Sequence, residues 1–281
     1  MSVDGLLRAA AGRLRGAGVE SPQREARLLL AHALGVAQER ILSGRVRPLT
    51  PEDSANFERL VSRREGREPL AYITGSREFW SLPFVVGPGV LIPRPESETL
   101  IEEALRRFPG RDSALDVLDL GTGSGCLLLA LISERPNARG LGIDISDAAL
   151  GYARRNAREL GLSHRVRFAR GNWCENLDGR FDAILVNPPY IGSEEFQFLA
   201  PELGYEPKLA LVAGSDGYEA YRKIAGEIGN HLKPGGAALF ELGQGQAVAL
   251  KRILDENGLA SLGTVSDLGG IPRCLIAGCR G

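Results

Sequence analysis

Four consecutive residues, Asn187-Pro188-Pro189-Tyr190, have the types and the order needed to hold a planar NH₂ group. Two successive prolines fix the backbone and contribute no N–H donor, so the Asn187 side-chain oxygen and the Pro188 carbonyl can both accept hydrogen bonds. Two acceptors that hold both hydrogens favour a pyramidal nitrogen and direct its lone pair at an electrophilic methyl group. Tyr190 can stack on a flat amide or base. The tetrad predicts an active site for transfer to a conjugated nitrogen; a proline-rich turn after a strand is the alternative.

A glycine-rich loop, Gly121-Thr122-Gly123-Ser124-Gly125, precedes the tetrad in the chain. Glycines at alternate positions allow the backbone to approach a ligand closely, and the helix expected after the loop would direct its amino end at that ligand. The spacing G-x-G-x-G differs from the dinucleotide fingerprint G-x-G-x-x-G. Asp144 follows about twenty residues later, where a carboxylate at a strand end can accept hydrogen bonds from both ribose hydroxyls. Together they predict a cofactor site; a plain tight turn and a helix cap are the alternatives.

The elements that must position these residues alternate between strand and helix after Pro95. This alternation predicts an α/β fold with a doubly wound, mostly parallel sheet, in which ligands bind at the carboxyl ends of the strands. Two final strands without an intervening helix predict an antiparallel end to the sheet. The predicted strands are 115–120, 140–145, 166–169, 181–186, 237–242, 262–265 and 273–277, and the predicted helices are 98–108, 126–134, 148–160, 218–232 and 247–257.

The first part of the chain has a different character. Residues 1–70 are rich in Ala, Leu, Arg and Glu with apolar positions at helical spacing, and Ser21-Pro22 and Thr50-Pro51 are typical helix starts. Residues 71–93 contain extended pieces, among them Ile73-Thr74 and Val90–Ile92, separated by Gly and Pro, which predicts a β-hairpin. We therefore predict a small helical N-terminal domain over 1–70, a hairpin linker over 71–93 and a catalytic domain over 94–281.

Composition excludes several classes of protein. The 281 residues carry a formal net charge of -1, whereas a dedicated nucleic-acid binder usually has a strong basic excess. The four cysteines form no C-x-x-C pair and the three histidines are scattered, so we expect neither a metal site nor a disulfide framework. The amino end lacks a long apolar run and no segment is apolar enough to span a bilayer. We expect a cytoplasmic protein that does not bind membranes.

The pattern of motifs resembles known methyltransferases. The loop is similar to the first motif of class I methyltransferases, in which it wraps the amino-acid end of S-adenosylmethionine. Nearly the whole chain resembles the peptide-chain release factor glutamine N5-methyltransferases (HemK/PrmC). The segments that carry this resemblance are Ser21-Pro22, Glu25-Ala26, 71–80, 91–96, 121–125, 187–191, Tyr205-Glu206-Pro207, 211–214 and 267–273.

The resemblance implies a fold, a cofactor and a substrate. It implies a Rossmann-like class I methyltransferase domain that transfers a methyl group from S-adenosylmethionine to the glutamine amide of the Gly-Gly-Gln motif in release factors. The glycine loop, Asp144 and Asn187 would contact the cofactor, and Trp173 would lie beside its adenine; packing in the core is the alternative for Trp173. This chain has Asn172 where the family usually has Asp. Because all recognisable cofactor motifs lie after residue 110, we expect the helical N-terminal domain to recognise the release factor. We also expect a monomer without direct nucleic-acid binding.

Other residues and other functions stay open at this point. Phe79 and Trp80 are interpreted as packing at a domain junction, and Arg94 and Glu96 as either helix capping or part of the site. An N6-adenine DNA or RNA methyltransferase would use the same tetrad, because adenine presents the same exocyclic amine. A non-catalytic binding protein that kept the fold and a nicotinamide oxidoreductase are the further alternatives.

Overall fold

The structure, a computed structural model, describes residues 2–280, and they pack into two units. The smaller unit contains the chain up to Ser76 together with Ala200–Tyr205, and the larger unit contains Arg77–Leu199 and the chain from Glu206 onward. The chain therefore leaves the larger unit once, for six residues, and then returns to it. Each unit is described by itself below.

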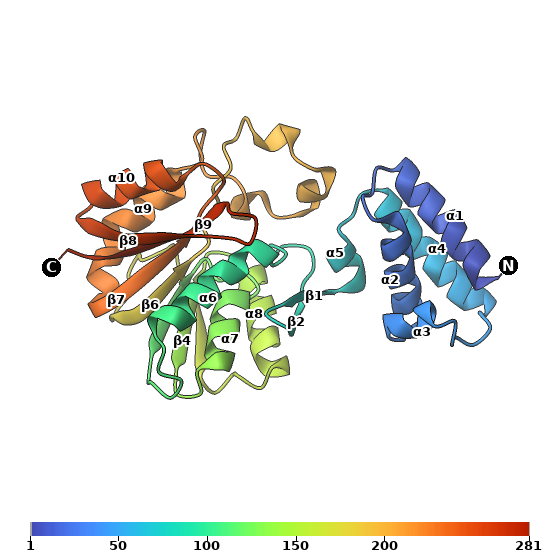
Figure 1. The fold of residues 1–281 in the computed structure, drawn as a ribbon, viewed down its shortest axis with the longest axis horizontal. Helices are drawn as coiled ribbons and strands as arrows, with labels where there is room; N and C mark the ends of the chain where they lie inside the picture. Colours follow the sequence, from blue (N-terminus) through green and yellow to red (C-terminus); the bar gives the residue numbers. More distant parts are fainter. Residues whose placement is uncertain (1, 281) are drawn as a thin grey trace. The chain divides into compact units, whose positions relative to one another are not determined.

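The smaller unit is helical, as Figure 1 shows in blue. Leu14, Leu29, Leu30, Phe57 and Val61 are fully buried in its core. The Thr50 side chain and the Asp53 side chain form a reciprocal capping box at the start of the fourth helix. Its helices are α1 Val3–Gly16, α2 Pro22–Leu34, α3 Gln38–Leu42, α4 Pro51–Glu65 and α5 Leu70–Thr74.

The segment Ala200–Tyr205 is fixed to the smaller unit by charge and by one hydrogen bond. Glu202 accepts from Arg64 at 2.9 Å and from Arg67 at 2.7 Å. The hydroxyl of Tyr205 donates to the carbonyl of Gly66 at 2.6 Å. Arg64 is nearly fully buried, so water screens the attraction within its ion pair less than it would at the surface.

The larger unit is built on a seven-stranded sheet of order β5-β4-β3-β6-β7-β9-β8. The first five strands in this order are parallel, whereas β9 is antiparallel to both β7 and β8. The predicted antiparallel end of the sheet is thus confirmed. The strands are β3 Asp116–Leu120, β4 Arg139–Asp144, β5 Val166–Arg170, β6 Phe181–Val186, β7 Leu232–Glu241, β8 Leu259–Ser266 and β9 Pro272–Cys279.

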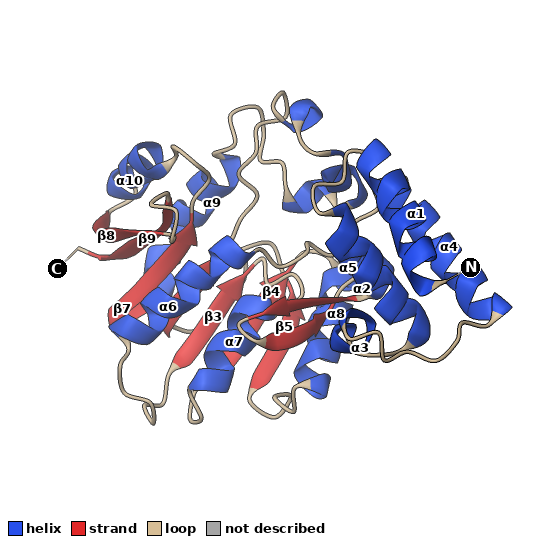
Figure 2. Ribbon diagram, turned by 45° about the vertical axis from the view of Figure 1, so that its right-hand side comes forward, coloured by secondary structure: helices blue, strands red, loops and turns tan. Residues whose placement is uncertain are grey.

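Helices cover both faces of this sheet (Figure 2). Side chains alternate along each strand, so that Val117 contributes to one hydrophobic core and Leu118 to the other. The central strands are apolar almost throughout because both of their faces are buried. On one face lie α6 Glu98–Arg107, α7 Cys126–Glu134 and α8 Asp147–Glu159; on the other lie α9 Glu219–Ile228 and α10 Ala247–Glu256.

Two predictions about residues 71–93 are wrong. Ile73 and Thr74 lie in helix α5, which the left-handed residue Gly75 ends. Val90–Ile92 form no strand, because the N–H of Ile92 donates instead to the Glu206 side chain at 2.9 Å. The hairpin itself exists and consists of β1 Ser76–Phe79 and β2 Leu82–Val85.

The aromatic residues of the hairpin belong to the larger unit. Phe79 is buried in the core formed by α6 and α7 and contacts Phe84 edge to face, with ring centroids 6.2 Å apart. The Trp80 indole donates to Glu134 at 2.9 Å. These contacts anchor the hairpin to the larger unit.

Leu30→Ala tests whether the two units are stable independently. Removing this fully buried side chain should lower the free energy of unfolding of the smaller unit by about 2–5 kcal/mol. Amide hydrogen exchange should accelerate in α1, α2 and α4 and stay unchanged in β3 and β6. Leu42→Ala, in the same unit but 59% exposed, serves as the control with near-normal exchange. Equal acceleration in β3 would show that the chain unfolds as one unit.

Candidate active site

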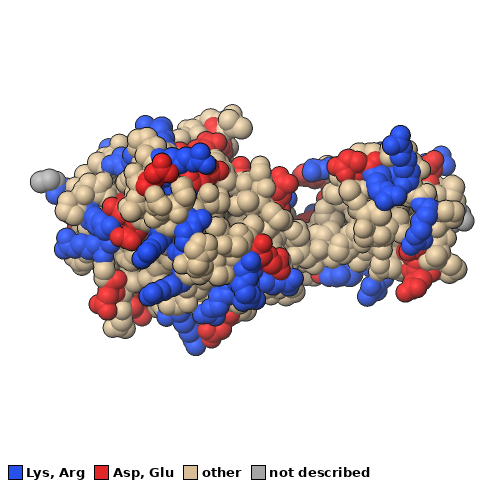
Figure 3. All heavy atoms as spheres, turned by 90° about the horizontal axis from the view of Figure 1, so that it is seen from below, with Lys and Arg blue, Asp and Glu red and all other residues tan. Residues whose placement is uncertain are grey.

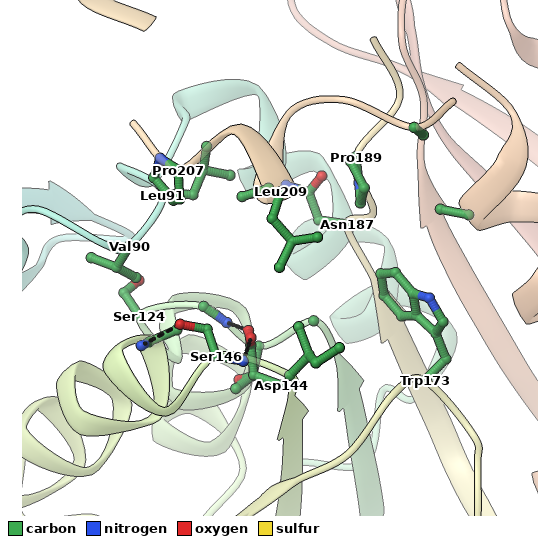
Figure 4. A pocket seen from close by; sticks show the side chains of 18 of the residues that line it. Val90, Leu91, Ser124, Asp144, Ser146, Trp173, Asn187, Pro189, Pro207 and Leu209 are labelled. Carbon is green, nitrogen blue, oxygen red and sulfur yellow. Dashed lines mark hydrogen bonds between the residues drawn. The ribbon is translucent and has the colours of Figure 1, made fainter. Parts of the chain in front are cut away.

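A cavity of about 470 Å³ opens at the carboxyl ends of β3, β4 and β6. All of its lining residues belong to the larger unit. Figure 4 shows Asp144, Trp173, Asn187 and Leu209 around the same open space. The predicted site residues that line the cavity are Gly121, Thr122, Gly123, Ser124, Asp144, Trp173, Asn187 and Pro189.

Three predicted site residues lie outside this lining: Gly125, Pro188 and Tyr190. Gly125 precedes α7 with φ +80°, and a Cβ there would lie 3.1 Å from Leu129 and 3.3 Å from Ala153. Its lack of a side chain therefore serves helix packing. Tyr190 packs against the core beneath α9, and its carbonyl accepts from Gln246 at 2.9 Å.

The glycine loop brings backbone close to the ring of Trp173. The N–H groups of Gly121 and Thr122 donate to the Ile143 carbonyl at 2.8 and 2.9 Å, which ties the loop to β4. Gly121 has φ +72°, and a Cβ at this position would lie 3.1 Å from Cζ3 of Trp173. Glycine at this position therefore permits both the left-handed turn and the close approach of the indole.

Asp144 holds the glycine loop in place, and its carboxylate oxygens can still accept hydrogen bonds from a ligand. One carboxylate oxygen accepts from the N–H of Gly123 at 2.8 Å, and the other from the N–H of Ser146 at 2.8 Å. A carboxylate has about four lone-pair positions, so each oxygen retains capacity on the cavity side. Burial raises the pKa of Asp144, while the Ser146 and Gly123 amides act in the opposite direction.

Asp119 is a buried carboxyl whose role the sequence did not reveal. It accepts from the hydroxyl of Thr122 at 2.6 Å, beneath the glycine loop. Burial raises the pKa of Asp119 to about 7, with the Thr122 hydrogen bond opposing that shift. Asp119 therefore fixes one residue of the loop from below.

Asn187 directly follows β6 and is held by a residue that the sequence analysis did not select. Its Nδ2 donates to the hydroxyl oxygen of Ser97 at 3.2 Å. Ser97 is 2% exposed and lines the cavity just before α6. Because the amide nitrogen faces Ser97, the amide oxygen is left to accept a hydrogen bond from a ligand.

The side chain of Asn172, the residue before Trp173, is oriented by Glu175. Asn172 Nδ2 donates to Glu175 at 2.9 Å, and Glu175 also pairs with Lys223 at 2.6 Å. The Asn172 oxygen is therefore the end left to accept a hydrogen bond. Asn172, Trp173 and Lys223 all line the cavity.

The remaining wall of the cavity is largely apolar and is held by a buried carboxylate. Val90, Leu91, Pro207 and Leu209 lie together on this side (Figure 4). Glu206 accepts from the Ile92 N–H and pairs with Arg94 at 2.6 Å. Arg94 thus lies in the wall of the cavity. Of its two interpretations, helix capping and part of the site, this position favours the second.

The residues present fit the cofactor that the sequence resemblance implies. The cavity volume lies in the usual range for small-molecule sites, about 300–1,000 Å³. Asp144 offers acceptors for a diol, Gly121 and Gly123 offer half-buried backbone without a side chain, and Trp173 offers an aromatic face. Among residues 2–280, no cluster of His, Cys, Asp and Glu could hold a metal ion.

The charge distribution and the helices add two observations. On the face that Figure 3 shows, Lys and Arg side chains gather over the lower part of the larger unit, with acidic side chains among them. In the part of the chain that the structure describes, no helix is long and apolar enough to cross a bilayer.

Comparisons with known proteins identify both parts of the chain. Residues 5–75 match the PrmC N-terminal domain, and residues 111–260 match a methyltransferase domain. The release factor glutamine methyltransferase of Rhodospirillum rubrum is 45% identical over 273 residues, which are 97% of this chain and 83% of the relative. That of Cereibacter sphaeroides is 43% identical over 272 residues, 96% of either chain.

A solved structure extends the comparison to the fold. The 16S rRNA N2 G1207 methyltransferase of T. thermophilus, in complex with AdoMet and guanosine, matches with a TM-score of 0.55 at 20% identity. The match covers 73% of this chain and 50% of that one. Together with the matching family models, it confirms the predicted class I methyltransferase fold.

Asp144→Ala should weaken the binding of S-adenosylmethionine by about 1.5–3 kcal/mol, the range for hydrogen bonds to a charged group. The loss has two sources, because the Gly123 and Ser146 amides lose their acceptor as well. Isothermal titration calorimetry measures it directly. Asp147→Ala, whose side chain is 70% exposed three residues later, is the control with unchanged affinity. Unchanged affinity in Asp144→Ala would remove this carboxylate from the cofactor site.

Proposed function

This chain belongs to the family of release factor glutamine methyltransferases, and we propose that it methylates the glutamine of the Gly-Gly-Gln motif in peptide-chain release factors. The methyl group would come from S-adenosylmethionine and go to the side-chain amide nitrogen. One observation carries the proposal: the Asn187 amide, with its oxygen end free, faces the same cavity as Asp144 and the glycine loop.

The chain's own residues would hold and orient the reacting amide. When bound, the cofactor supplies an activated methyl group with a good leaving group. Asn187 Oδ1 and the Pro188 carbonyl would accept the two N–H bonds of the glutamine amide, and Tyr190 would support the tetrad from behind. Holding both hydrogens turns the nitrogen lone pair toward the methyl group, so positioning provides most of the rate enhancement. The apolar wall around Leu209 would exclude water.

The same geometry would accept the amine of adenine, so an N6-adenine methyltransferase is the alternative to exclude. The formal net charge of -1 favours a protein substrate. Similarity to curated release factor glutamine methyltransferases over nearly the full chain favours it further.

The direct test is mass spectrometry after incubation with labelled cofactor. An intact release factor should gain one methyl group on the Gly-Gly-Gln glutamine, and its Gln→Glu variant should gain none. A DNA duplex and an RNA oligonucleotide form the second arm and should remain unlabelled. Labelling of adenine without labelling of glutamine would contradict the proposal and identify the chain as an N6-adenine methyltransferase.

We further propose that the helical smaller unit recognises the release factor. The support is that every residue lining the cofactor cavity lies in the larger unit, which leaves the helices without a part in the small-molecule site. We expect a monomer that acts in the cytoplasm, where release factors work, and that binds neither nucleic acid nor membranes directly.

Asn187→Ala should reduce single-turnover methylation of a release factor by roughly 10²–10³, the effect of losing one preorganised hydrogen bond, about 2.7–4 kcal/mol of barrier. The loss should fall mainly on kcat, because the interaction strengthens as the lone pair localises. Thermal melting should be nearly unchanged, since the residue follows β6 and faces the cavity. Near-normal turnover by a folded variant would contradict the role of the tetrad.

Removal of residues 1–76 should abolish the preference for intact release factor over a short Gly-Gly-Gln peptide. Affinity for S-adenosylmethionine should stay within a few fold, measured by calorimetry. The truncation also frees Ala200–Tyr205, so full-length Glu202→Ala is the control that loosens this segment but keeps the helices. If the truncated chain kept wild-type kcat/KM on the intact substrate, the helices would have no part in recognition.

A further inference from the structure

The orientation of Asn187 depends on two buried residues that the tetrad does not include. Ser97 accepts a hydrogen bond from Asn187 Nδ2 at 3.2 Å, and the Ser97 hydroxyl stabilises the charged form of Glu241, whose pKa it lowers. Ser97 and Glu241 are each 2% exposed. Ser97 thus links the Asn187 amide at the cavity to a buried carboxyl through one hydrogen bond and one electrostatic interaction.

The sheet itself brings Glu241 next to Asn187. Strands β6 and β7 are parallel, and their register pairs Val186 with Phe240. The next residue on each strand is Asn187 and Glu241 respectively, so both side chains emerge at the same end of neighbouring strands. Glu241 does not line the cavity, whereas Ser97 and Asn187 do. Glu241 can therefore act on a ligand only through its neighbours.

Neither Ser97 nor Glu241 has an evident structural role. Ser97 occupies the N-cap position of α6, yet its side chain makes no capping hydrogen bond, although serine is favoured there for that bond. Glu241 Oε2 is buried without a hydrogen-bond partner in the described chain. A buried, incompletely satisfied carboxyl costs stability, so its presence calls for a function.

We propose that Ser97 and Glu241 are positioning residues that fix the polarity of the Asn187 amide for the reaction. A serine hydroxyl has one hydrogen. When ionised Glu241 accepts that hydrogen, the Ser97 oxygen can only accept from Asn187, so Nδ2 must face Ser97 and Oδ1 must face the cavity. The inference rests on the proposed function, in which Oδ1 holds one hydrogen of the substrate amide.

Protonation of Glu241 would remove this constraint. A protonated carboxyl can donate to Ser97, which then can donate to Asn187 Oδ1 and allow the amide to flip. The flipped amide presents N–H donors to the substrate NH₂, which cannot accept them without giving up its reacting lone pair. Orientation of Asn187 therefore requires the ionised form of Glu241.

The groups around Glu241 determine the pH at which this occurs. Burial raises the pKa of Glu241 to about 7, against the Ser97 hydrogen bond and the positive charge of Arg273. The ionisable groups that interact electrostatically with it are Arg94 and Glu96 before α6, Cys126 on α7, Tyr190 after β6, Tyr221 on α9, and Arg273 and Cys274 on β9. Activity should fall as the pH decreases through this region, and a cationic ligand in the cavity would move the fall to lower pH.

The experiment is single-turnover methylation of intact release factor by Ser97→Ala, Glu241→Gln and the double variant. Each should lose roughly 10- to 100-fold in kcat, with KM and affinity for S-adenosylmethionine within about twofold of wild type. The double variant should be no slower than Ser97→Ala, since Glu241 acts only through Ser97. Glu241→Gln should also lack the acid limb that wild type shows in its pH profile. Glu103→Gln, a buried carboxyl paired with Arg106 on α6, is the matched control with normal kcat.

The outcomes separate this inference from the proposed function. Normal kcat in folded Ser97→Ala and Glu241→Gln, with Asn187→Ala inactive, would overturn the positioning role alone. Normal kcat in Asn187→Ala as well would overturn the proposed mechanism. Glu241→Gln removes a buried charge and should melt at or above the wild-type temperature. This variant therefore tests the positioning role even if Ser97→Ala does not fold. Additive losses in the double variant would contradict the linear chain of contacts.

Discussion

The site depends on one constraint: the register of three parallel strands aligns their carboxyl ends. Leu120 on β3 pairs with Ile143 on β4 and with Val186 on β6, so the three strands finish side by side. Gly121, Asp144 and Asn187 are the residues that follow or end these strands, and they meet for that reason alone. A slip of one residue in either pairing would turn these side chains to the opposite face of the sheet.

Most elements of the larger unit could be predicted because their local signals agree with their environment. Strand β6 and helix α7 begin and end where the sequence predicted, since a buried parallel strand and a fully buried helix are both continuous apolar runs of characteristic length. Residues 73–74 and 90–92 contain similar β-branched residues, but the first pair lies in helix α5 and the second segment belongs to no strand. Local composition shows that a segment can adopt an extended conformation. Whether it forms a strand depends on residues elsewhere in the chain that could pair with it.

The site divides in the same way. Gly121, Asp144 and Asn187 could be predicted because their residue types suit cofactor and amide binding and because each lies at the end of a predicted strand. Ser97 has only the sequence signal of a helix cap, and its contact with Asn187 spans 90 positions. Glu241 could have been found by one further step, by counting the parallel register from Asn187 to the neighbouring strand. Residues that act through other residues are visible only when strand pairing is known.

Buried carboxyls recur around the cavity, and each fixes a different wall. Asp119 holds Thr122 of the glycine loop, Glu206 holds the Ile92 amide and Arg94, and Glu241 lies behind Ser97. The pKa values of Asp119 and Glu241 are both raised to about 7 by burial. For such groups the folded state binds more protons than the unfolded state, so their contribution to stability is greatest below the unfolded pKa and is lost as the pH rises to about 7.

The ionised site is therefore the less stable one. Orientation of Asn187 needs Glu241 charged, while folding favours the protonated carboxyl, so catalysis and stability call for opposite protonation states of one residue. The apolar cores on both faces of β7, the strand that ends at Glu241, supply the stability that offsets this cost. The large apolar cores on both faces of the sheet are thus what allows a charge to be kept beside the cavity, where it can fix the direction of an uncharged amide.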